Sequence, residues 1–210
     1  MTPSPDALDE ALLAEIGARG GVRRYPANSV LVTEGDAGDA LYIILSGRVK
    51  AYGTDADGRE VVYSVQGPGE YFGEMTLDGG VRSASVATLE ASSCVVVGGA
   101  QVRDFLAHHP DFARHLVTKL IRLARRSTAK VKSLALSDVY GRLAALLREL
   151  AREEGEHWVV AEKLTQQDIA DRIGASREMV SRIFKQLVTG GYISLASRRI
   201  VLLKTLPARW

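Results

Sequence analysis

The chain has 210 residues, of which 46 % are hydrophobic and 25 % charged, and its formal net charge is +2. This composition is typical of a folded chain of one or two domains and excludes a wholly disordered or collagen-like chain. No apolar run approaches the roughly 20 residues of a transmembrane helix, and the N-terminus lacks a basic segment followed by an apolar one. The single cysteine, Cys94, cannot form an intrachain disulfide and cannot supply a four-thiolate cluster or a Cys-rich zinc site. We therefore expect a cytoplasmic protein without membrane contact.

Charge is unevenly distributed along the chain. Residues 1–137 carry 15 Lys+Arg against 16 Asp+Glu, a net of −1, whereas residues 138–210 carry 12 against 9, a net of +3. A basic C-terminal part on a nearly neutral body favours a polyanion such as nucleic acid as its partner. A solvated basic surface without a partner is the alternative.

Residues 1–110 have the pattern of a small β domain preceded by a short helix. Apolar residues at helical spacing predict the helix within the first 20 residues, and short apolar runs cut by glycine turns follow from Val22 to Val97. Asp57-Gly58 predicts a hairpin with a two-residue loop. These features favour an antiparallel barrel or jelly roll. The expected strands are Leu41–Leu45, Val49–Tyr52, Val61–Val65, Ala84–Leu89 and Ser93–Val97.

The next segment is helical. A short helix is predicted at Gln101–His108, and a long one over residues 111–137, which contain neither Gly nor Pro. One set of residues along the long helix is spaced alternately four and three residues apart, which is the spacing of a coiled-coil seam. The seam is apolar at first and is then interrupted by Ser127 and Lys130, and we interpret the helix as a dimer helix. Its positions are Leu116, Leu120, Leu123, Ser127, Lys130, Leu134 and Ser137.

Residues 138–210 predict a winged helix-turn-helix. Asp138 is an N-cap for a helix that ends near Glu153, and an acidic turn at residues 153–156 follows. Thr165 and Ser176 are expected to cap two further helices, the first of them stopped by Gly174. Two apolar strands then flank a turn with Arg198 and Arg199. The predicted fold is therefore α+β, with an antiparallel β-roll (1–110), a dimerisation helix (111–137) and a winged helix-turn-helix (138–210).

The second helix of this pair has the side chains of a DNA-reading helix. In a helix-turn-helix, the N-terminal turns of the second helix enter the major groove. Arg177 and Arg182 suit guanine, and Glu178 suits the amino group of cytosine. A glutamate argues against a surface that merely attracts phosphates. The residues expected to contact phosphates are Gln167, Ser176 and Lys185.

A glycine-rich segment in the β domain suits a small ribose phosphate. Glycines around Gly73 allow backbone N–H groups to approach an anion closely. Arg82 and Ser83 provide a guanidinium fork and a hydroxyl for a phosphate, and Glu74 can accept hydrogen bonds from sugar hydroxyls. A glycine-rich turn with a surface arginine is the alternative.

Five motifs in order give the chain a resemblance to the Crp-Fnr family of bacterial transcription regulators, which includes the cyclic-AMP receptor proteins. The resemblance extends from about Tyr25 to Leu203. The motifs are Leu41–Val49, Tyr71–Glu74, Arg82–Ala84, Leu134–Arg142 and Ile173–Arg182.

The resemblance implies cyclic AMP as effector and no metal. Gly73 and Glu74 match the groups that bind the cyclic phosphate and the ribose 2′-hydroxyl, and Arg82 and Ser83 match the phosphate clamp. The hydroxyl pair that reads adenine, one member coming from the partner subunit, corresponds to Ser127 and Thr128.

The resemblance also implies the DNA target and the partners. Arg177, Glu178 and Arg182 match a base-reading trio with a TGTGA-like half-site. A homodimer then requires a palindromic operator. RNA polymerase is a further expected partner, although the segment Glu153–Glu162 is shorter and more acidic than the family's polymerase-contacting loop.

Two positions near the ligand depart from the family pattern. The adenine-reading pair is Ser then Thr, where enterobacterial members have Thr then Ser. Leu123 stands where those members have an arginine that pairs with the ribose-binding glutamate. Arg122, Arg125 and Arg126 are the candidates to replace that arginine.

Three alternatives remain at this stage. The same fold could answer to cyclic GMP, to cyclic di-GMP or to no effector. A haem or metal sensor is disfavoured, because the histidines lie at helix starts or on the acidic turn: His108, His109, His115 and His157. A kinase module or an enzyme is disfavoured, because the chain has no P-loop, no Gly-x-Ser-x-Gly and no His–Cys pair.

Overall fold

The structure is a computed structural model that describes residues 4–155, 157–196 and 199–207. The chain divides into two compact units, residues 1–125 and 126–210. The long helix α3 (Pro110–Leu136) contributes to both units. The sequence instead predicted domain boundaries after residues 110 and 137, so that the long helix forms a separate segment between two domains. That division stays a prediction.

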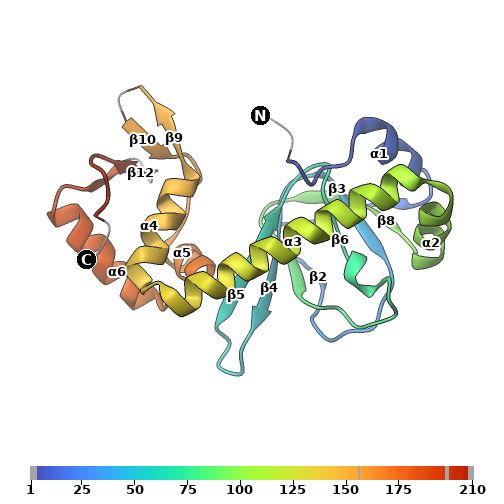
Figure 1. The fold of residues 1–210 in the computed structure, drawn as a ribbon, viewed down its shortest axis with the longest axis horizontal. Coiled ribbons are helices and arrows are strands. Elements are labelled where there is room, and N and C mark those ends of the chain that lie inside the picture. The colour runs from blue at the N-terminus through green and yellow to red at the C-terminus, as the bar shows by residue number, and fades with distance from the viewer. Residues whose placement is uncertain (1–3, 156, 197–198, 208–210) are drawn as a thin grey trace. The chain divides into compact units, whose positions relative to one another are not determined.

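Two four-stranded antiparallel sheets build the first unit (Figure 1). One sheet has the order β1 (Gly21–Tyr25), β8 (Ser92–Val97), β3 (Leu41–Ser46), β6 (Tyr71–Phe72). The other has the order β2 (Val30–Val32), β7 (Ser85–Thr88), β4 (Val49–Thr54), β5 (Glu60–Gln66). The helices α1 (Glu10–Gly17) and α2 (Gly99–His108) complete the unit together with the first turns of α3. This arrangement confirms the predicted antiparallel β-roll.

Three apolar clusters lie in this unit, and the smallest of them consists of Tyr52, Val62 and Ala87. The two larger ones join its sheets and helices. One is formed by inward-facing strand residues, namely Ile44, Val49, Phe72, Val86 and Cys94. The other joins the first sheet to the three helices, and its largest members include Tyr71, Phe105 and Phe112. Each large apolar side chain that is buried contributes about 1.5–3 kcal/mol. Leu116, expected in the dimer seam, belongs to the second cluster and packs on its own unit.

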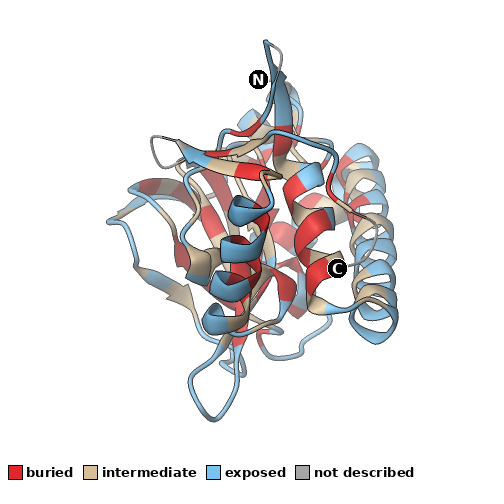
Figure 2. Cartoon of the chain, turned by 90° about the vertical axis from the view of Figure 1, so that its left-hand side faces the viewer, coloured by how far each residue is buried: buried red, intermediate tan, exposed pale blue. Residues whose placement is uncertain are grey.

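The second unit contains α4 (Val139–Leu150), α5 (Gln166–Ile173) and α6 (Arg177–Thr189). Its antiparallel sheet has the order β11 (Ile193–Ala196), β12 (Arg199–Leu202), β10 (His157–Val160), β9 (Ala151–Glu154). The core lies between the helices and this sheet, and Figure 2 shows buried positions along the inner faces of the helices. The order of these elements confirms the predicted winged helix-turn-helix.

The caps of this unit are the predicted ones. Asp138 accepts a hydrogen bond from the backbone N–H of Gly141 at 2.7 Å. Thr165 and Asp168 form a reciprocal capping box at the start of α5, and Ser176 caps α6. Such caps satisfy N–H groups that have no partner within the helix.

Two details of the prediction were wrong. The loop between β4 and β5 spans residues 55–59 rather than two residues, because Asp55 accepts hydrogen bonds from the backbone N–H groups of Asp57 and Arg59. The helix expected to end near Glu153 ends at Leu150. The next four residues pair with β10, since this pairing buries Ala151 beside Val160.

The predicted wing turn is only partly within the described residues. Arg198 lies outside them. Arg199 is the first residue of β12, and its guanidinium lies 2.5 Å from the Glu154 carboxylate.

Among the described parts of the chain, no helix combines the length and apolar character needed to cross a membrane.

Candidate ligand site and nucleic-acid interface

The turn after β6 requires glycine. Gly73 has φ +92°, a conformation that side chains with a Cβ rarely adopt. A Cβ atom built on Gly73 would lie 2.6 Å from the Ala40 carbonyl oxygen and 2.7 Å from Nη1 of Arg82. The turn therefore packs directly against the arginine that the sequence assigned to a phosphate.

The Arg82 guanidinium is fixed beside this turn. It donates to the Gly73 carbonyl at 3.2 Å and to the Ala40 carbonyl at 3.0 Å, and the residue is 6 % exposed. Nη1 also lies 3.5 Å from the Thr76 hydroxyl oxygen. A guanidinium has five N–H donors, so these three acceptors leave donors for an anion. The structure thus brings together two of the predicted ligand residues, Gly73 and Arg82.

Glu74 follows directly and begins the short 3-10 helix η1 (Glu74–Thr76). Its carboxylate is almost buried and lies 3.0 Å from Nζ of Lys119 on α3. Lys119 also donates to the Tyr71 carbonyl oxygen. Burial lowers the pKa of Lys119, and the Glu74 carboxylate opposes that shift.

Lys119 is the residue that sequence reasoning missed. Of the three arginines considered as partners for Glu74, Arg122 instead pairs with Asp6, with Nε 2.7 Å from Oδ1. Lys119 lies four residues before Leu123 and thus on the same face of the helix. The four-residue spacing between Lys119 and Leu123 was the feature of the sequence that could have identified Lys119 as the partner of Glu74.

The other predicted ligand residues are Ser83, Ser127 and Thr128. Ser83 is exposed, and its hydroxyl donates to the Met75 sulfur at 3.2 Å. Ser127 and Thr128 are exposed on α3 and belong to the second unit. Their part in the ligand site stays a prediction.

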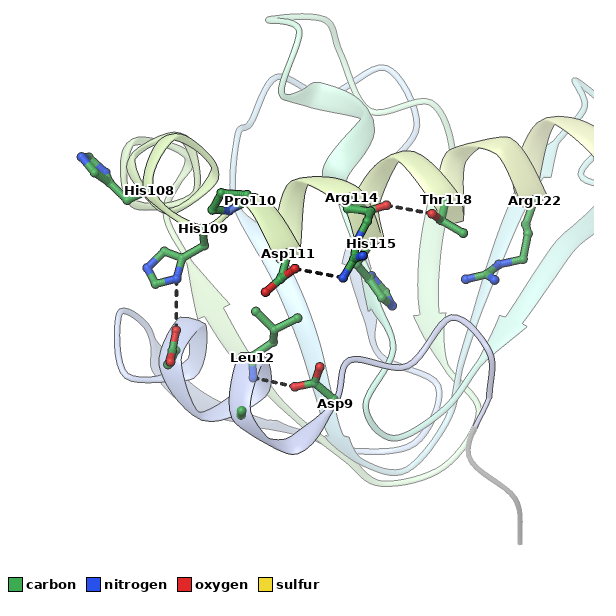
Figure 3. Close-up of a pocket in the computed structure, with 12 residues that line it drawn as sticks. Asp9, Leu12, His108, His109, Pro110, Asp111, Arg114, His115, Thr118 and Arg122 are labelled. Carbon is green, nitrogen blue, oxygen red and sulfur yellow. Dashed lines mark hydrogen bonds and ion pairs between the residues drawn. The ribbon is translucent and has the colours of Figure 1, made fainter.

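A cavity of about 560 Å³ lies between α1, the end of α2 and the start of α3 (Figure 3). None of the predicted ligand residues lines it. Two pairs of its ionisable side chains contact each other: His109 lies 3.1 Å from Glu15, and Arg114 lies 2.9 Å from Asp111. This cavity is therefore distinct from the cluster around Arg82.

The described residues contain no group of three or more His, Cys, Asp or Glu side chains arranged to hold a metal ion.

The predicted base-reading residues share the exposed face of α6. Arg177, Glu178 and Arg182 are all exposed near the start of the helix, whereas its opposite face lies in the core. Lys185 extends the exposed face by one turn. This face therefore offers three cations and one carboxylate, a set able to read base edges and contact phosphates. The buried residues of α6 are Val180, Ile183, Phe184 and Leu187.

The other two predicted phosphate contacts lie at helix starts. The Ser176 hydroxyl oxygen accepts from the Met179 N–H at 3.3 Å, and its own hydrogen remains able to donate. Gln167 is exposed on α5, where its amide donates to Asp171 at 2.7 Å.

Arg142 holds the turn between α5 and α6. Its guanidinium donates to the carbonyls of Ile173 at 2.8 Å, Gly174 at 3.3 Å and Ser137 at 2.7 Å. Gly174 ends α5 with φ +63°. The turn that orients α6 is thus fixed by a partly buried arginine as well as by a glycine cap.

Two domain families match the two halves of the chain. The cyclic nucleotide-binding domain matches residues 22–109, and the Crp-like helix-turn-helix domain matches residues 141–206. The first match contains Gly73, Glu74, Arg82 and Ser83, and the second contains the whole of α5 and α6.

Relatives match over most of their own length. A CRP-like cAMP-activated global transcriptional regulator of Mycobacterium tuberculosis is 34 % identical over 183 residues, which are 85 % of this chain and 82 % of the relative. The cAMP-activated global transcriptional regulator CRP of Pasteurella multocida is 32 % identical over 209 residues, 97 % of this chain and 98 % of the relative.

Solved structures share the fold. The c-di-GMP responsive global regulator CLP of Xanthomonas campestris superposes with a TM-score of 0.84 at 25 % identity, covering 94 % of this chain and all of that one. A CooA mutant of Carboxydothermus hydrogenoformans gives 0.80 at 18 % identity, over 94 % of this chain and 93 % of that one, which shows the fold alone. The chain therefore belongs to the Crp family of DNA-binding transcription regulators, which are not enzymes, and carries an effector-binding domain of the cyclic nucleotide-binding type.

Proposed function

We propose that this protein is a homodimeric transcription regulator gated by cyclic AMP, which binds a palindromic operator with TGTGA-like half-sites. The observation that carries the effector assignment is the buried Arg82 guanidinium, fixed at the positive-φ turn of Gly73 and followed by a buried Glu74. An anion and a sugar hydroxyl can both be bound at such a cluster.

Different residues would bind the phosphate, the ribose and the adenine of the effector. Arg82, the Gly73 N–H and the Ser83 hydroxyl bind the cyclic phosphate, and Glu74 accepts from the ribose 2′-hydroxyl. Ser127 and Thr128 contact adenine, one of them from the partner subunit. Two relatives named as cAMP-activated regulators support cyclic AMP. The similarity to a c-di-GMP responsive regulator supports cyclic di-GMP as the second candidate.

The exposed face of α3 supports the homodimer. Several large apolar side chains on this helix are exposed in the single chain, including Val117 at 55 % and Ile121 at 48 %. Apolar helix faces of this kind are buried in helix dimers. Two-fold symmetry would then present two copies of α6 to a palindrome.

The operator assignment depends on Arg177, Glu178 and Arg182 at the start of α6. RNA polymerase is the expected partner on DNA, and the cytoplasm is the expected place of action, since that is where a bacterial chromosome lies.

Calorimetric titration with cyclic AMP, cyclic GMP and cyclic di-GMP tests the effector. We expect selective binding of cyclic AMP, weakened about 10- to 100-fold or abolished by Arg82→Ala, because each hydrogen bond to a charged group contributes about 1.5–3 kcal/mol. The matched control is Arg103→Ala, which removes an exposed arginine from α2 and should leave the affinity unchanged. Selective binding of cyclic di-GMP would favour the second candidate, and no binding at all would contradict nucleotide gating.

A further inference from the structure

A buried ammonium group faces the carboxylate assigned to the ribose. Nζ of Lys119 lies 3.0 Å from Oε1 of Glu74, and the two side chains are 5 % and 7 % exposed. The same Nζ donates to the Tyr71 carbonyl oxygen and lies 3.7 Å from the centre of the Tyr71 ring. Three electron-rich groups, a carboxylate, a carbonyl and an aromatic face, therefore surround one cation.

Stability alone is a weak explanation for this pair. Removing two charges from water costs several kcal/mol per ion, and well-packed apolar residues often stabilise a core as well as a buried ion pair does. Other ion pairs of the same unit lie at its surface or fix its N-terminal segment, as Arg122 does with Asp6. The pair of Lys119 and Glu74 instead joins α3 to the residue that follows the Gly73 turn.

The geometry leaves part of the carboxylate available. A carboxylate has two oxygens with about four acceptor sites, and Lys119 engages Oε1. The charge-assisted contact with Lys119 fixes the orientation of the Glu74 carboxylate and leaves its other acceptor sites open. A carboxylate that is already fixed in one orientation binds a hydroxyl donor more strongly than a mobile one does, because less conformational freedom is lost on binding.

We propose that Lys119 is a positioning residue for effector selectivity: it holds the Glu74 carboxylate in one orientation, and thereby makes the site select nucleotides that carry a 2′-hydroxyl. This inference rests on the proposed function, in which Glu74 accepts from the ribose. It assigns to Lys119 the pairing with Glu74 for which Arg122, Arg125 and Arg126 were the candidates in the sequence.

A comparison of cyclic AMP with 2′-deoxy cyclic AMP tests the proposal by calorimetry. We expect the unmodified protein to prefer cyclic AMP by about tenfold or more. In Lys119→Met this preference should fall below about threefold, through weaker binding of cyclic AMP with little change for the deoxy nucleotide. Lys119→Arg, which keeps the charge, should retain the preference. The matched control is Lys132→Met, which removes an exposed lysine of the same helix and should change neither affinity.

The ratio of the two affinities separates positioning from a merely structural role, because a distorted site would weaken both nucleotides equally. An unchanged preference in Lys119→Met overturns the proposal and leaves the proposed function intact. A lack of preference in the unmodified protein overturns it too, whereas failure to bind any cyclic nucleotide overturns both. Where Lys119→Met does not fold, Lys119→Gln, which keeps an N–H donor without the charge, should show the same loss of preference.

Discussion

Cys94 lies in the core between the two sheets of the first unit and is fully buried. Burial raises the pKa of its thiol to about 11. The thiolate is the reactive form, and at pH 7 a thiol with such a pKa holds only about one thiolate in ten thousand molecules. We therefore expect Ellman's reagent to leave Cys94 unmodified in the folded protein and to react with one thiol per chain in guanidinium. Rapid reaction of the folded protein would contradict this placement and would favour redox sensing.

Glu178 is the one acidic residue in the predicted base-reading trio, and it is exposed on the second residue of α6. A carboxylate near DNA is unfavourable unless a base donor, such as the amino group of cytosine, faces it. Glu178→Ala should therefore relax the preference at one base pair of each half-site, at a cost of about 1–3 kcal/mol in discrimination. Competition among single-base operator variants at one salt concentration measures this loss.

The control for this experiment is Glu149→Ala. Glu149 is an exposed carboxylate of the second unit outside α6, so its loss changes net charge by the same amount. We expect it to raise the affinity for all sequences alike and to leave the order of preference intact. If Glu178→Ala behaved in the same way, Glu178 would not read a base.

At the scale of elements, α5 depends on its N-terminal cap. The helix has eight residues, and its Thr165 hydroxyl oxygen accepts from the Asp168 N–H at 3.1 Å while Asp168 accepts from the Thr165 N–H at 2.8 Å. Thr165→Ala should lower the free energy of unfolding of the second unit by about 0.5–2 kcal/mol. Urea unfolding followed by tryptophan fluorescence reports this, because Trp158 lies on β10 of that unit.

Ser181→Ala is the matched control for the cap. Ser181 is exposed on α6, and the change should stay within about 0.5 kcal/mol. Equal midpoints for Thr165→Ala and Ser181→Ala would show that the capping box contributes nothing measurable.

The elements also show why some features were predictable from the sequence. Thr165, Ser176 and Asp138 were recognised because a cap is a local interaction over about three residues. The hairpin of β9 and β10 was missed, since residues 151–154 contain good helix formers. Pairing of β10 with β12, which is distant in sequence, joins this hairpin to the sheet, and such pairing is not visible in the local sequence. Lys119 was missed for the same reason. Its helix was predicted, but tertiary packing decides that this face of α3 meets Glu74.

At the scale of the whole molecule, α3 is the element that both units share. It carries Lys119 within the first unit and Ser127 and Thr128 within the second. We propose that cyclic AMP bound at the Arg82 cluster also contacts Ser127 and Thr128, and that its binding shifts the population toward conformations with higher affinity for DNA. By linkage, operator DNA would then raise the affinity for cyclic AMP by the same factor as cyclic AMP raises the affinity for DNA.

Removing both hydroxyls of the adenine-reading pair tests this coupling. In the unmodified protein we expect cyclic AMP to raise operator affinity by about 5- to 150-fold, the usual range for allosteric coupling. The double variant Ser127→Ala, Thr128→Ala should reduce that factor to less than about threefold, because the ligand would lose the proposed hydrogen bonds to these two hydroxyls. Thr118→Ala, which removes another exposed hydroxyl of α3, should leave the factor unchanged. Fluorescence anisotropy of a labelled operator, with and without saturating cyclic AMP at one salt concentration, measures both affinities. An undiminished factor in the double variant would mean that the signal reaches α6 without this hydroxyl pair.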